Sequence, residues 1–83
     1  MTDDDLKRAI VAELRKVAPE ADAATLSPDE PLREALDIDS FDFLNVLIGL
    51  NVALGVEVPE ADYGTLNTLN GMLRYFRERT PAA

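Results

Sequence analysis

The stretch DSFDFLNVLIGLNVALG, residues 39–55, decides the fold. It is apolar for most of its length, and it begins with aspartate and serine, two residue types that favour helix starts. It ends at a glycine, which commonly follows the last turn of a helix. The stretch therefore predicts a helix over residues 41–54, with Asp39 or Ser40 as its cap and Gly55 as its stop.

At about 100° per residue, this helix is apolar on two sides. One side carries Phe43, Val46, Leu47, Leu50 and Leu54. The opposite side carries Phe41, Leu44, Ile48 and Val52, beside Asn45 and Asn51. An 83-residue chain can hardly bury a helix all round. We expect the first side to face the core, and the second to be covered by a loop or offered to a partner.

Two small residues, Gly49 and Ala53, lie on one flank between these sides. Glycine inside a helix costs about 1 kcal/mol relative to alanine. We interpret both residues as places where a neighbouring helix approaches closely.

Two further helices are predicted on either side of this one. Thr2 and Asp5 have the spacing of a capping box, and the apolar residues that follow recur at helical spacing until Pro19. These residues are Leu6, Ile10, Leu14 and Val17. The last helix should be capped by Asn67 or Thr68 and stopped by Pro81. Its predicted buried stripe is Leu69, Met72, Leu73 and Phe76.

The connecting segments complete an all-α prediction. Residues 59–63 favour a brief helix that begins with proline and closes at Gly64. Residues 19–39 contain three prolines and predict a long loop, in which one helical turn could start at Ser27. We therefore expect one domain over residues 1–83: a small four-helix bundle of three main helices and one short helix.

Composition excludes several kinds of chemistry. The chain has no cysteine and no histidine, which removes disulfides, thiolate chemistry and the usual zinc and imidazole chemistry. The acidic N-terminus does not resemble a signal peptide, and no stretch approaches the ~20 apolar residues of a membrane span. We expect a soluble, cytoplasmic, monomeric protein that does not bind membranes.

The formal charge of −8 is unevenly placed. Residues 17–66 contain eleven acids and a single base, Arg33, which gives this segment a net charge of −10. This segment should repel nucleic acid and attract proteins with basic patches. The charge could also serve only solubility.

Ser40 lies among three carboxylates, and four roles compete for it. It could cap the helix. It could be a nucleophile, but the chain has no histidine to activate it, so we expect no catalysis. It could lie in a calcium loop that starts at Asp37. That loop would place Phe41, Asp42 and Ile48 where a fifth ligand, a glycine and a closing glutamate are required, so we predict no metal site. Lastly, its hydroxyl could be modified by another enzyme, because a phosphate would sit at the positive end of the helix dipole.

The segment LDIDSFDFL, residues 36–44, resembles the modification site of the acyl carrier proteins, commonly D-S-L or D-S-M followed by an acid. The residues LGVEVPEADYGTLNTLNGMLRYF, 54–76, are similar to the link and the last two helices of that family. The resemblance implies that Ser40 carries 4'-phosphopantetheine, added by a phosphopantetheinyl transferase, and that the arm holds acyl groups as thioesters.

The resemblance also assigns roles to the neighbours of Ser40. Asp39 would flank the attachment site where the transferase and its metal engage the carrier. The partner-binding residues would be Phe41, Asp42, Leu44, Asn45, Ile48 and Val52. The partners would be acyl-transferring or acyl-activating enzymes with basic and apolar docking patches.

The second helix departs from the fatty-acid type of carrier. Those carriers have several glutamates along it, whereas here Asp42 is its one acid. The cargo could therefore belong to fatty-acid, polyketide or related specialised biosynthesis, or the chain could be an aminoacyl or peptidyl carrier. An unmodified acidic adaptor is the alternative from another class.

Overall fold

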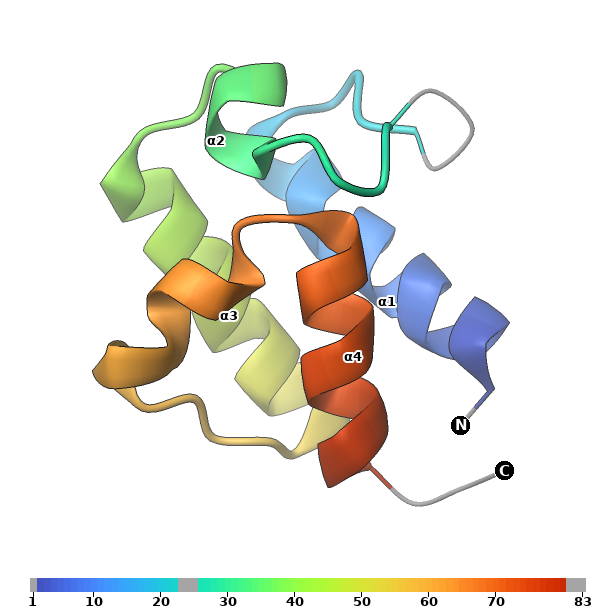
Figure 1. Cartoon of the computed structure of the whole chain (residues 1–83). Coiled ribbons are helices and arrows are strands. Elements are labelled where there is room, and N and C mark those ends of the chain that lie inside the picture. The colour runs from blue at the N-terminus through green and yellow to red at the C-terminus, as the bar shows by residue number, and fades with distance from the viewer. Residues whose placement is uncertain (1, 23–25, 81–83) are drawn as a thin grey trace.

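The structure, a computed structural model, describes residues 2–22 and 26–80. Its elements are α1 (Asp3–Val17), α2 (Leu32–Ala35), α3 (Ser40–Leu54), the 3-10 helix η1 (Glu60–Leu66) and α4 (Leu69–Arg79). The long helix α1 contacts both α3 and α4, η1 packs against α4, and α2 lies at the end of the bundle where α3 begins (Figure 1). The predicted all-α bundle is confirmed, and no strand occurs in the described ranges. None of the helices found there is long and apolar enough to cross a membrane.

Helix α1 begins at the predicted capping box. The Asp5 N–H donates to Thr2 Oγ1 and the Thr2 N–H donates to Asp5 Oδ2, both at 3.1 Å. The hydrogen bond from the Thr2 N–H, with a further contribution from the Thr2 side chain, holds the pKa of the Asp5 carboxyl below its ordinary value, because it favours the charged form. Leu6, Ile10 and Leu14 of this helix are completely buried.

The short helix α2 differs from the prediction. Residues 27–30 form only a turn, in which the Glu30 N–H donates to the Ser27 carbonyl at 3.2 Å. The helix starts after Pro31, whose φ of −58° suits a helix entry. Leu32 is fully buried and anchors α2 to the core. A hydrogen-bonded turn thus starts at Ser27, and the sequence did not predict the separate helix α2 that follows Pro31.

Helix α3 packs as the wheel predicts. Its core side is buried, and Leu54 packs half-buried against the core. The buried residues are Phe43, Val46, Leu47 and Leu50. The helix ends at Gly55, which adopts the left-handed conformation with φ 69°.

The two small residues of α3 behave differently from each other. A Cβ on Gly49 would overlap Glu13 Oε1, so the absence of a side chain lets the Glu13 carboxylate of α1 pack there. Glu13 is only 8% exposed, and its Oε2 pairs with Lys16 Nζ at 2.6 Å. The close approach is confirmed at Gly49. It is wrong for Ala53, which is exposed.

The C-terminal part of the chain contains more helix than predicted. η1 passes Gly64, where we expected it to close, and ends at Leu66, which is completely buried. Thr68, not Asn67, caps α4: its Oγ1 accepts the Gly71 N–H at 2.9 Å. The predicted stripe of α4 is buried, and Pro81 lies outside the described residues.

Gly71 is a point of close approach between η1 and α4. A Cβ there would overlap the backbone carbonyl oxygen of Thr65, whereas a Cβ on Gly64 would meet nothing. The backbone carbonyl cannot rotate away as a side chain can.

Gly71→Ala should therefore destabilise the protein by about 1–3 kcal/mol, the usual range for overpacking. Gly64→Ala is the matched control and should leave the urea midpoint nearly unchanged. Equal midpoints for the two variants would contradict the close approach.

The two sides of α3 should respond differently to truncation. Leu47→Ala removes a buried side chain and should cost about 2–5 kcal/mol, whereas Ile48→Ala removes an exposed one and should cost far less. Thermal melting of both variants checks this, and a larger loss for Ile48→Ala would mean that the two sides are inverted.

Candidate functional site

Ser40 is the first residue of α3, and its side chain is exposed. The cap is the residue before it, since Asp39 Oδ1 accepts the Asp42 N–H at 2.8 Å. The Ser40 hydroxyl has no hydrogen-bond partner in residues 2–22 or 26–80. Of the two predicted caps, Asp39 is thus the one found, and the serine hydroxyl is left to solvent at the positive end of the helix.

The end of α2 sets the position of Asp39. The Ile38 N–H donates to the Arg33 carbonyl at 3.0 Å, and the Asp37 N–H donates to the Glu34 carbonyl at 3.4 Å. These two bonds form a Schellman motif, and Asp37 occupies its left-handed position with φ 52°. Aspartate tolerates this conformation better than most residues. The motif turns the chain so that α3 begins at Ser40, two residues after Ile38.

A pocket of about 440 Å³ opens beside Ser40, between α3 and η1. Phe41, Leu44 and Tyr63 supply an apolar wall, and Arg33 and Asn67 supply polar groups. Ser40, Phe43 and Gly64 complete the lining. Sequence reasoning missed Arg33, Tyr63 and Asn67 as parts of this site, because α2 and η1 meet α3 only in the folded chain.

The second apolar side of α3 is not covered by the long loop. Phe41 is 69%, Ile48 53% and Val52 81% exposed. Asn45 is also exposed, while Asp42 and Leu44 are half-buried. The six predicted partner-binding residues thus lie along one helix that begins at Ser40.

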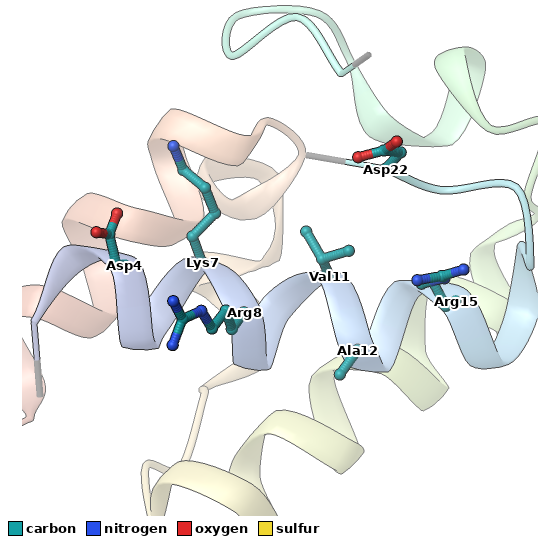
Figure 2. A pocket seen from close by; sticks show the side chains of 7 residues that line it. All are labelled: Asp4, Lys7, Arg8, Val11, Ala12, Arg15 and Asp22. Atoms are coloured by element: carbon teal, nitrogen blue, oxygen red, sulfur yellow. The ribbon is translucent and has the colours of Figure 1, made fainter. Parts of the chain in front are cut away.

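A larger groove, of about 510 Å³, lies on the outer side of α1 and contains none of the predicted site residues. Lys7, Arg8 and Arg15 project from α1 around Val11, with Asp22 of the following loop facing the helix (Figure 2). Ala12 and Asp4 complete its lining. None of the residues that line it also lines the pocket beside Ser40.

A sequence profile of the family described as phosphopantetheine attachment site matches residues 8–76. The chain belongs to this family. It is 29% identical to the acyl carrier protein of Thermosynechococcus vestitus over 75 residues, which are 90% of this chain and 88% of that protein. It is 26% identical to the acyl carrier proteins of Rickettsia typhi and Rickettsia prowazekii over 58 residues, 70% of this chain and 67% of each of theirs.

The residues around Ser40 fit the group for which the family is described. Phosphopantetheine has an anionic phosphate at one end and a chain of amides and methylenes beyond it. The pocket places a cation, an amide side chain and an apolar wall beside one exposed hydroxyl. In the described ranges, no three Asp or Glu side chains gather where they could hold a metal ion.

The cap assignment predicts unequal effects for two neighbouring substitutions. Asp39→Ala should destabilise the protein by about 0.5–2 kcal/mol, since the Asp42 N–H loses its acceptor. Ser40→Ala should change the free energy of unfolding much less, because no hydrogen bond is lost. Urea denaturation of both variants tests this, and the reverse order would make Ser40 the cap.

The Schellman motif gives a second prediction about the approach to the site. Asp37→Ala should cost about 1 kcal/mol or more, because alanine disfavours the left-handed conformation. Asp37→Gly and Asp37→Asn, which both tolerate it, should be at least as stable as the wild type. If the Asp37→Ala and Asp37→Gly proteins melted at the same temperature, the positive φ of residue 37 would be wrong.

Proposed function

We propose that Ser40 carries a covalent 4'-phosphopantetheine arm and that the protein carries acyl groups on it as thioesters. One observation supports this most directly: the unpartnered hydroxyl of Ser40 lies at the start of α3, beside a pocket that fits the arm, in a chain of the phosphopantetheine attachment family. The arm supplies the thiol that the chain lacks.

The modification requires another enzyme. A phosphopantetheinyl transferase would form the phosphoester bond to Ser40 Oγ and break the pyrophosphate bond of coenzyme A, releasing adenosine 3',5'-bisphosphate. The proton of Ser40 would go to a base of the transferase. Asp39 flanks the hydroxyl and is exposed, so it is the residue we propose to meet the transferase and its metal.

Partner enzymes would bind along α3. The exposed side chains of Phe41, Ile48 and Val52 offer apolar area that begins next to the arm. A partner that acts on the end of the arm must approach this end of the bundle. Asp42, Leu44 and Asn45 would complete the contact.

The low charge of α3 bears on the cargo. Asp42 is its only charged residue, so most of the acids that could attract a basic patch on a partner lie in the segments before and after α3. We therefore propose an acyl carrier of fatty-acid, polyketide or related specialised biosynthesis, monomeric and cytoplasmic, that does not catalyse a reaction. An aminoacyl or peptidyl carrier is the second candidate, favoured by the same low charge of α3.

Loading of Ser40 is the direct test. Incubation with coenzyme A and a phosphopantetheinyl transferase should add the mass of one phosphopantetheine to the intact protein. Ser40→Ala should stay folded and gain no mass, while Ser27→Ala, another exposed serine, should load normally. Loading of the Ser40→Ala protein would end the proposal.

The partner face is tested by placing a charge on it. Ile48→Glu should leave thermal stability nearly unchanged, because Ile48 is half exposed, and it should lower the rate of acyl transfer by a partner enzyme, because an unpaired charge would be buried at the interface. Ala12→Glu adds the same charge on α1, outside α3, and is the control. If both variants lowered transfer equally, net charge rather than the face would be responsible.

A further inference from the structure

Arg33 is the single base among eleven acids in residues 17–66. It is exposed, and its guanidinium forms no ion pair with any described residue. A cation surrounded in sequence by so many carboxylates would find partners easily at the surface. Its lack of one leaves the charge available for another anion.

The backbone of Arg33 is held from two directions. Its N–H donates to Asn67 Oδ1 at 3.2 Å, and its carbonyl accepts the Ile38 N–H at 3.0 Å. The first bond ties α2 to the junction of η1 and α4, and the second belongs to the turn that leads into α3. These two bonds fix the Arg33 backbone relative to η1 and α3, between which the pocket lies, although the Arg33 side chain is exposed.

Arg33 is also the one charged residue among those that line the pocket beside Ser40. The other lining residues are uncharged, and Phe41, Leu44 and Tyr63 are apolar or aromatic. The carboxylates of this segment therefore lie outside the pocket lining, while its cation lies inside it. This arrangement favours an anion close to the Ser40 hydroxyl.

We propose that Arg33 binds the phosphate of the arm on Ser40 and thereby directs the arm into the pocket. This inference rests on the proposed function. The planar guanidinium fits two phosphate oxygens at once, which an ammonium does not. An anion added to a segment of charge −10 is repelled by its neighbours, and Arg33 offsets this repulsion where the phosphate is attached. Arg33 is a positioning residue, since it acts on the arm and not on the cargo.

The contact should depend on salt. Arg33 is exposed, so the ion pair is screened as ionic strength rises. An exposed pair of this kind shifts the ratio of docked to free arm by roughly two- to five-fold. The arm should therefore exchange between the pocket and solvent, as delivery to a partner requires.

The experiment is phosphorus NMR of the loaded protein, with no acyl group attached, as a function of sodium chloride. In the wild type the phosphodiester resonance should differ from that of the loaded protein unfolded in urea, and should move towards it with salt. In Arg33→Gln the resonance should lie close to that of the unfolded reference already at low salt, and added salt should not move it further. Arg33→Lys should retain part of the shift.

Arg74→Gln is the matched control. Arg74 is exposed, forms no ion pair with the described residues, and lines a different pocket with Tyr75 and Glu78. It should reproduce the wild-type titration. An Arg33→Gln spectrum identical to the wild type, or the same displacement in Arg74→Gln, would overturn the inference.

Two outcomes separate this inference from the proposed function. The mass of each sample shows whether Ser40 is loaded, so a wild type that accepts no arm overturns the proposed function and the inference with it. A fully loaded wild type whose resonance ignores salt and matches the unfolded reference overturns the role of Arg33 alone. That second result needs no variant, so it stands even if Arg33→Gln fails to fold.

Discussion

Helix α3 is apolar on two sides in a chain too small to bury both, and the rest of the structure follows from that constraint. The side that contains Leu47 and Leu50 packs into the core against α1. On the opposite side, Leu44 is half-buried beside η1, but no described element covers Ile48 and Val52, which stay exposed. The core side explains why the bundle is stable, and the exposed side explains why the protein has an apolar surface that begins at Ser40.

The helices were predictable because their signals are local. The capping box of α1, the stripe of α4 and the core side of α3 depend on residues within a few positions of one another, and all three are found as predicted. The choice between Asp39 and Ser40 as cap was not predictable, since both residue types favour the position. It depends on one dihedral angle and one hydrogen bond, which only the folded chain determines.

The errors share a physical cause, which is contact between residues distant in sequence. Asn67 accepts the Leu32 N–H at its backbone carbonyl and the Arg33 N–H at its side chain, and so fixes α2 against the start of α4. No local pattern indicates a partner 34 residues away. The same applies to η1, which continues past Gly64 because Leu66 enters the core. The pocket beside Ser40 was invisible in the sequence for this reason. Ala53 is the opposite case, because it is exposed and the expected contact with a distant element is not made.

The hydrogen bonds of Asn67 also connect the fold to the site. They hold α2 in place, α2 ends in the turn at Asp37, and that turn determines where α3 starts and hence where the Ser40 hydroxyl points. The long loop between α1 and α3 therefore acts as a support for the start of α3 rather than as a cover for its apolar side. The proposed modification needs this division: the hydroxyl must stay accessible to a modifying enzyme, while the residues around it must hold it in one position. Buried Leu32, Leu36 and Ile38 anchor this segment on either side of the exposed turn at Asp37, and the Asp39 carboxylate caps α3, so apolar anchors and a capping acid together fix the start of the helix.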